Sequence, residues 1–325
     1  MTGGTFTADT LAAFRRLRRK LSLWRTLAIV AIVAAVAALF WEKTDGGFGE
    51  HIARVRISGL ITGNQRLLDL LDSLKKSKKV KAVIVRIDSP GGTTVGSEAV
   101  FHKLRQIAAK KPVVAVMDSV AASGGYITAI AADRIYAREN TITGSIGVIF
   151  QWAEVHDLLS KLGVKMNTLK SGPLKAQPNP FEPLTPEAKR VTEELVRQSY
   201  DWFVALVAKR RGLDRDAVLK LADGRVYLGK DARSKGLIDA IGDEEAAKDW
   251  LVKEKGLKDS LKIVERKPKK LPEELGLGFS LIQWGAKFFG FDAVLERGQF
   301  SQGLALDGLL ALWHPRLQYQ ARGSQ

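Results

Sequence analysis

The feature that most constrains the fold is an alternation of continuously apolar segments with amphipathic ones. Segments 80–87 and 112–117, VKAVIVRI and PVVAVM, have the β-branched, uninterrupted apolar character of strands that are buried on both faces. Segments 66–77 and 97–111 instead repeat leucine, valine and isoleucine at helical spacing. Because strands that alternate with helices require right-handed crossovers, we expect an α/β fold with a largely parallel sheet.

Other segments predict further elements of this fold. Residues 52–61 and 134–138 are typical of strands, and residues 164–172 predict another short strand. A proline-rich loop at 173–186 precedes a long helix at 187–212. The glycine-bearing motifs DSPGG and AASGG follow the two most apolar strands, and parallel strands place such motifs together at one edge of the sheet. We therefore expect two turns there, the second of which opens a helix.

An uncharged N-terminal segment predicts a membrane anchor. Residues 26–41 carry no charge, Trp24 and Trp41 stand at the two ends, and arginines crowd into residues 15–25. A spanning helix needs roughly 17–25 apolar residues, and its basic flank stays in the cytoplasm. We expect a basic cytoplasmic N-terminus at 1–25 and one transmembrane helix at 26–41 in the inner membrane, with the rest of the chain in the periplasm. A cleavable signal peptide is the alternative, because the alanine-rich end offers cleavage positions.

The remaining chain divides into a linker at 42–50, a main domain at 51–256 and a tail at 257–325. The tail contains an apolar, aromatic series that is expected to contact the membrane or another subunit. The formal net charge is +16, but the basic runs are not interleaved with aromatic residues, which favours lipid-facing or solvated surfaces over nucleic acid. Cysteine is absent, which excludes disulfides, thiolate metal sites and a cysteine nucleophile.

The AASGG motif contains a candidate nucleophile, Ser123. The backbone N–H groups of Gly124 and of Gly92, in DSPGG, are candidates for an oxyanion hole, in which each donor lowers the barrier by on the order of 3 kcal/mol. A serine hydroxyl also needs a base. The histidines stand at ordinary surface, linker or tail positions, so a lysine with a lowered pKa is the expected base. These histidines are His51, His102, His156 and His314.

Lys175, in SGPLKAQP, is the best candidate for that base, because its loop carries little other charge and contains several prolines. Ser145, in TGSIG, could hydrogen-bond to the lysine and orient it. Each motif also has an ordinary interpretation. AASGG can be merely a helix start, DSPGG a turn, TGSIG a loop and Lys175 a solvated side chain.

Taken together, these motifs resemble the signal peptide peptidase A family, which are serine–lysine peptidases with the Clp protease/crotonase fold of repeated ββα units. The resemblance spans about residues 50–250, in the single-length form of the family. It rests on VIVRIDSPGG, MDSVAASGGYITAIAADRIYA, TITGSIGVI, KSGPLK and ADGRVYLGKDARSKGLID, which occur in the order typical of the family.

The resemblance implies a role for each candidate residue. Ser123 would be the nucleophile, Lys175 the general base with Lys170 as fallback, and Ser145 the hydroxyl that holds the lysine. Gly92 and Gly124 would supply the oxyanion-hole donors, and no metal or organic cofactor would be needed.

The resemblance also implies partners. Subunits would form a closed ring, in which Lys175 could serve Ser123 of the next subunit. The substrates would be remnant signal peptides and other short or unfolded peptides, cleaved through an acyl-enzyme. Two alternatives stay open, because a fold does not fix a function. One is a crotonase-type acyl-CoA enzyme, which shares the sheet and the paired glycines, and the other is a non-catalytic membrane scaffold.

Overall fold

The computed structural model describes residues 20–21, 23–31, 49–268 and 310–312. The chain divides into two units, Met1–Gly49 and Glu50–Gln325. In the first unit, residues 23–31 are helical and carry exposed apolar side chains. The predicted span continues into residues 32–41, which lie outside the described residues, as do the predicted linker up to residue 48 and most of the predicted tail. Within the described ranges, no helix is both long and apolar enough to cross a membrane.

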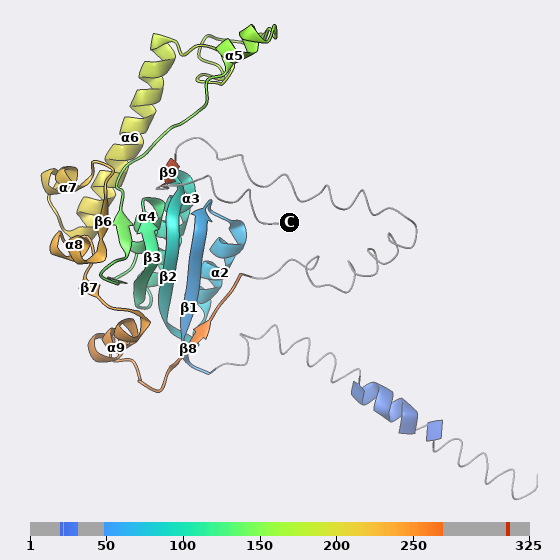
Figure 1. The fold of residues 1–325 in the computed structure, drawn as a ribbon. Coiled ribbons are helices and arrows are strands. Elements are labelled where there is room, and N and C mark those ends of the chain that lie inside the picture. Colours follow the sequence, from blue (N-terminus) through green and yellow to red (C-terminus); the bar gives the residue numbers. More distant parts are fainter. Residues whose placement is uncertain (1–19, 22, 32–48, 269–309, 313–325) are drawn as a thin grey trace, which may run out of the picture. The chain divides into compact units, whose positions relative to one another are not determined.

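One sheet forms the centre of the second unit (Figure 1). Its described part has nine strands, in the order β6–β5–β3–β2–β1–β8, with β4 beside β3, β7 beside β4 and β9 beside β2. The β5–β6 pair and the β2–β9 pair are antiparallel, whereas the other strand pairs are parallel. This arrangement confirms the predicted α/β fold with a largely parallel sheet. The strands are β1 (His51–Ile61), β2 (Val80–Thr93), β3 (Val113–Ala122), β4 (Arg134–Ala137), β5 (Ile142–Gly144), β6 (Val226–Leu228), β7 (Ala240–Ile241), β8 (Lys262–Glu265) and β9 (Leu310–Leu312).

The strands send alternate side chains into two apolar cores, as the two-residue period of a strand requires. On β2, Val83 and Val85 belong to a core shared with α2, α3 and α4, whereas Ala82 and Ile84 belong to a core shared with α9. The helices of this unit are α2 (Gln65–Lys76), α3 (Thr94–Ala108), α4 (Gly124–Ala129), α5 (His156–Lys161), α6 (Pro186–Arg211), α7 (Arg215–Leu221), α8 (Gly229–Ser234) and α9 (Glu244–Lys255).

Several elements differ from the prediction. The DSPGG motif is not a turn, because β2 continues to Thr93 and its last residues pair with β1 and β9. Residues 164–170 have no regular structure; they lie mostly exposed and have no neighbouring strand among the described residues. β1, β2 and β3 are each followed by a single helix, so their order is βα rather than the implied ββα repeat. β8 pairs with β1, so the sheet extends past residue 256.

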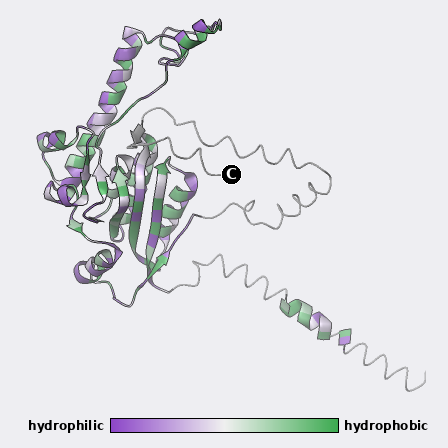
Figure 2. Cartoon of the chain, in the orientation of Figure 1, coloured by the Kyte–Doolittle hydropathy of each residue, from purple (hydrophilic) through white to green (hydrophobic). Residues whose placement is uncertain are grey.

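Residues 148–185, called the projecting segment below, leave the sheet and reach the N-terminal end of α6 (Figure 1). Most of the first half of α6 is exposed, whereas Phe203, Val204 and Val207 near its other end are buried in the main core. Hydrophobic and hydrophilic residues both lie along the projecting segment (Figure 2). Its exposed large apolar residues are Ile149, Leu158, Leu162, Val164, Met166, Leu169, Leu174 and Phe181.

Candidate active site

Ser123 lies directly between the end of β3 and the start of α4. The apolar strand ends in Ala121 and Ala122, which are fully buried, and Ser123 itself is 1% exposed. Its backbone N–H donates to the carbonyl of Gly144 at 2.8 Å. Its dihedral angles are φ 53° and ψ −115°, which a residue with a Cβ adopts only where its surroundings hold it.

The hydroxyl of Ser123 is the unusual part of this geometry. Its Oγ is buried and has no hydrogen-bond partner among the described residues. A buried hydroxyl normally finds a partner, since leaving it unpaired costs about 1–3 kcal/mol. The described residues therefore leave the Ser123 hydroxyl without a partner.

Close backbone contacts hold the end of β2 against the end of β1 and against the start of α4. A Cβ on Gly92 would lie 2.0 Å from the carbonyl oxygen of Ile61, and a Cβ on Gly125 would lie 2.7 Å from the carbonyl oxygen of Ser89. Only glycine fits at such distances. The predicted oxyanion-hole residues Gly92 and Gly124 thus lie on adjoining elements, and their role as donors stays a prediction.

Ser145 also lies close to Ser123 through backbone contacts. It follows Gly144, whose carbonyl accepts the N–H of Ser123, and its own N–H donates to the carbonyl of Arg225 at 2.8 Å. Ser145 is 7% exposed and has a φ of 49°. Arg225 belongs to the ADGRVYLG motif just before β6, which pairs with β5. The structure thus brings three of the predicted motifs together around Ser123.

A groove of about 930 Å³ begins at Ser145 and runs between the chain that leaves the sheet and α6. Its lining is mainly apolar and aromatic on the side formed by residues 147–152, where the ring centroids of Phe150 and Trp152 lie 5.9 Å apart. Tyr200 on α6 and Asp223 contribute polar groups to the opposite side. Such a groove suits apolar side chains of an extended ligand.

Lys175 is not brought to Ser123 within one chain. It is exposed on the projecting segment, and its backbone N–H donates to the carbonyl of Gly172 at 3.1 Å. The unpartnered Ser123 hydroxyl excludes a hydrogen bond from Lys175 in this structure.

The fallback lysine, Lys170, has a different environment. Its side chain is 15% exposed, and its Nζ is ion-paired with Glu182, to which Gln177 also donates. The hydrogen bond from Lys170 holds the pKa of Glu182 below its ordinary value. The ammonium group of Lys170 is thus already occupied by a carboxylate partner within the projecting segment.

Two features near Ser123 were missed by the sequence interpretation. β9 pairs antiparallel with the end of β2, with Gly92 opposite Ala311. Charged side chains also contact the last residues of β3 before Ser123. The apolar run around residue 310 and the acidic residues of DSPGG and MDSVAASGG were visible in the sequence, but nothing there indicated their partners.

The comparisons with known proteins agree with this site. The sequence model of the family described as "Peptidase family S49" matches residues 105–258. A Synechocystis sp. protein provisionally named a protease is 39% identical over 256 residues, which covers 77% of this chain and 92% of that protein. An Enterococcus faecium protein provisionally named signal peptide peptidase SppA is 36% identical over 269 residues, or 78% of each chain. Serine protease SPPA of Arabidopsis thaliana chloroplasts is 40% identical over 179 residues, which covers 55% of this chain and 26% of that protein.

A buried serine at the carboxyl end of a strand in a largely parallel sheet, within a sequence this similar to proteases, defines a serine protease. The chain belongs to peptidase family S49, with relatives among the signal peptide peptidase A proteins. Membership of this family selects a peptidase over the acyl-CoA enzyme and the scaffold.

Proposed function

We propose that this protein is a membrane-anchored serine endopeptidase in which Ser123 is the nucleophile and Lys175 of a neighbouring copy is the general base. The observation that carries the proposal is the buried Ser123 hydroxyl with no partner among the described residues. An activated serine needs a base within hydrogen-bond distance, and the described part of one copy offers none there.

Three features support Lys175 as the residue that fills this position from a second copy. It is exposed, whereas Lys170 is ion-paired with Glu182. It lies on a segment that displays many exposed apolar side chains, and such surfaces in soluble domains commonly contact another protein. A head-to-tail contact of this kind closes into a ring when its rotation permits. In that assembly Ser145 would hydrogen-bond to the incoming ammonium group.

The proposed substrates are remnant signal peptides and other extended, apolar peptides. The end of β2 already accepts β9 as an antiparallel strand, which is how an extended peptide adds to an exposed sheet edge. The apolar groove beside Ser145 offers space for substrate side chains. The name of the Enterococcus faecium relative points to the same substrate class. A single N-terminal span in the inner membrane, with the catalytic domain in the periplasm, would bring the site to peptides left in the lipid.

The proposed reaction proceeds through an acyl-enzyme. Ser123 Oγ bonds to the substrate carbonyl carbon while its proton passes to Lys175 Nζ, and the N–H groups of Gly92 and Gly124 donate to the oxyanion. The peptide C–N bond then breaks, and the leaving amine takes the proton from Lys175. A water molecule next gives a proton to the same lysine and attacks the ester, which releases the acid and restores the Ser123 hydroxyl.

Mixing two inactive variants tests the central claim. Full-length Ser123→Ala and Lys175→Ala proteins, each solubilised in detergent, are expected to show no hydrolysis of an apolar signal-sequence peptide. After subunit exchange, the mixture should regain about a quarter of the wild-type rate, because about one neighbouring pair in four then joins an intact serine to an intact lysine. A mixture that stays inactive, although exchange is verified with labelled subunits, would overturn catalysis between copies.

Membrane anchoring is tested separately. The full-length protein should stay with the membrane fraction in alkaline carbonate, and a chain that starts at residue 49 should not. Release of both proteins, or cleavage of the N-terminal segment during export, would contradict the anchor.

A further inference from the structure

The regular pairing of β3 breaks shortly before the strand ends. β3 pairs with β4 up to Met117 and with β5 from Val120 onward. On its other side, the partners on β2 advance only from Ile87 to Ser89 while those on β3 advance from Met117 to Ala121. β3 therefore carries two extra residues at this point, which is the pattern of a β-bulge.

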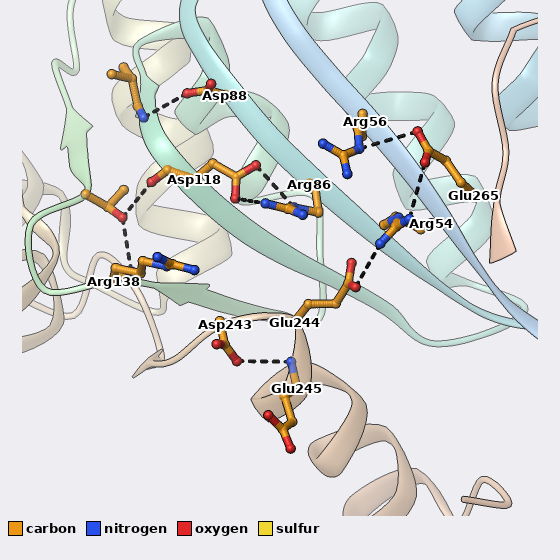
Figure 3. Close-up of polar contacts among 12 residues, drawn as sticks. Arg54, Arg56, Arg86, Asp88, Asp118, Arg138, Asp243, Glu244, Glu245 and Glu265 are labelled. Carbon is orange, nitrogen blue, oxygen red and sulfur yellow. Dashed lines mark hydrogen bonds and ion pairs between the residues drawn. The ribbon is translucent and has the colours of Figure 1, made fainter. Parts of the chain in front are cut away.

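Side chains from β2 hold this β3 bulge, defined here as residues 118–120 (Figure 3). The guanidinium of Arg86 makes a two-pronged pair with the carboxylate of Asp118, in which the Nε–Oδ2 distance is 3.2 Å. The carboxylate of Asp88 accepts a hydrogen bond from the backbone N–H of Val120 at 3.2 Å. A bulge leaves ladder groups unpaired, and this carboxylate satisfies one of them.

A third contact reaches the β3 bulge from the side of β5. The hydroxyl of Thr141 donates to the backbone carbonyl of Asp118 at 2.7 Å and accepts from the backbone N–H of Arg138. Thr141 is 2% exposed, so its position is fixed by its surroundings. Both neighbouring sides of the β3 bulge are thus tied to it by side chains.

We propose that Arg86, Asp88 and Asp118 are positioning residues for Ser123, which deepens the proposed function because it takes Ser123 as the nucleophile. Ser123 directly follows the end of β3 and has strained backbone angles that persist only where neighbouring structure imposes them. The β3 bulge fixes the direction in which the strand delivers this residue. The three side chains act through the backbone of the bulge and do not touch the substrate.

The alternative is that these are ordinary stabilising contacts on a charged sheet face, and the same face provides a matched comparison. Arg54, on β1, pairs with Glu265 at 3.2 Å, and the two side chains are 22% and 27% exposed. Arg86 and Asp118 are 24% and 23% exposed. The two pairs therefore resemble each other in chemistry and burial, but only one of them touches the β3 bulge.

The test uses the full-length, detergent-solubilised protein and three readouts. These are the rate constant of Ser123 labelling by a fluorophosphonate, kcat and KM for a peptide substrate, and the melting temperature. Asp88→Ala should lower the labelling rate and kcat about 10- to 100-fold with KM nearly unchanged, because small displacements of reacting groups cost factors of this size. Asp88→Asn should recover most of this loss, since an amide oxygen can still accept the Val120 N–H.

The control variant is Glu265→Ala. It should lower the melting temperature about as much as Asp118→Ala does, but leave the labelling rate at the wild-type value. If Asp88→Ala does not fold, Arg86→Lys keeps the charge, loses the two-pronged geometry, and should still slow labelling several-fold.

The outcomes separate this inference from the proposed function. Wild-type labelling rates in Asp88→Ala or Arg86→Lys would overturn the positioning role, as would an equal loss in Glu265→Ala. Labelling that persists in Ser123→Ala would instead overturn the assignment of the nucleophile, whatever the positioning variants do.

Discussion

The sheet around Ser123 and the projecting segment that carries Lys175 are built in opposite ways. Ser123 is 1% exposed, and both its own N–H and that of Ser145 are bonded to neighbouring backbone. On the projecting segment, Leu169 is fully exposed and Lys175 lies in solvent. The Ser123 side of the proposed site is thus held in place within each chain, whereas Lys175 lies on a surface that the described residues leave uncovered.

This difference suggests that folding of each chain positions Ser123, whereas assembly of several chains would position Lys175. Burial and short backbone contacts fix the position of Ser123, the proposed nucleophile, and they cost nothing further when a substrate arrives. Exposed apolar groups gain free energy only when another surface covers them, so the placement of Lys175 would depend on assembly. A protease built in this way would become active only in its assembled form.

The largest expected effect comes from removing the fixed half of the site. Ser123→Ala should abolish peptide hydrolysis, by on the order of 10⁶-fold, as for other serine proteases. Because the buried hydroxyl has no partner among the described residues, its removal relieves a cost of about 1–3 kcal/mol, so the same change should keep or raise the unfolding free energy. Kinetics and thermal unfolding of the full-length variant measure both. Residual turnover well above background, or a large loss of stability, would break the contrast.

The next effect separates the two lysines of the projecting segment. Lys175→Ala should lower kcat by about 10³-fold or more, since general bases contribute about 10²–10⁴-fold and the serine is otherwise unactivated. Lys170→Ala should cost less than about tenfold, because Lys170 is paired with Glu182. Steady-state kinetics at matched assembly would decide. The reverse ranking would move the base to Lys170.

A smaller effect concerns the exposed leucines. The double variant Leu162→Ser, Leu169→Ser should weaken self-association about tenfold or more, because covering each leucine is worth about 1.5–3 kcal/mol. Leu219→Ser, at a leucine on α7 that is 38% exposed, is the matched control and should leave association unchanged. Analytical ultracentrifugation in detergent measures both. Equal association of the two variants would show that the projecting segment lies outside the contact between copies.

The smallest effect is a pH dependence confined to the projecting segment. The hydrogen bond from Lys170 lowers the pKa of Glu182 from its ordinary 4.5. A lowered folded-state pKa contributes stability above pH 4.5, and that contribution is lost as pH falls through the folded value. Amide protection around residues 170–182 should therefore decrease on acidification in the wild type.

The matching variants test whether Glu182 is the cause. In Glu182→Gln this pH dependence should disappear, whereas Glu187→Gln, in the first turn of α6, should keep it. Hydrogen exchange with mass spectrometry follows both. An unchanged pH profile in Glu182→Gln would show that the Lys170–Glu182 ion pair does not cause the pH dependence of this segment.

Much of the fold could be predicted from local sequence patterns. The apolar runs of β2 and β3 and the helical repeats of α2, α3 and α6 each lie within a single segment, so periodicity alone indicated them. The position of Ser123 between a buried strand and a helix followed from the same patterns. The strand predicted around residues 164–170 was wrong, because a strand-like sequence forms a strand only where another strand can pair with it.

The sequence by itself determined the elements, their order and the serine, because these depend on neighbouring residues and on recognisable motifs. Only the tertiary structure decided that DSPGG stays within β2, that Arg86 and Asp88 hold the β3 bulge, and that Lys175 does not reach Ser123 in one chain. These features join residues from separate elements. Their free energy comes from partners that no local pattern specifies, so they become visible only when the strands are side by side.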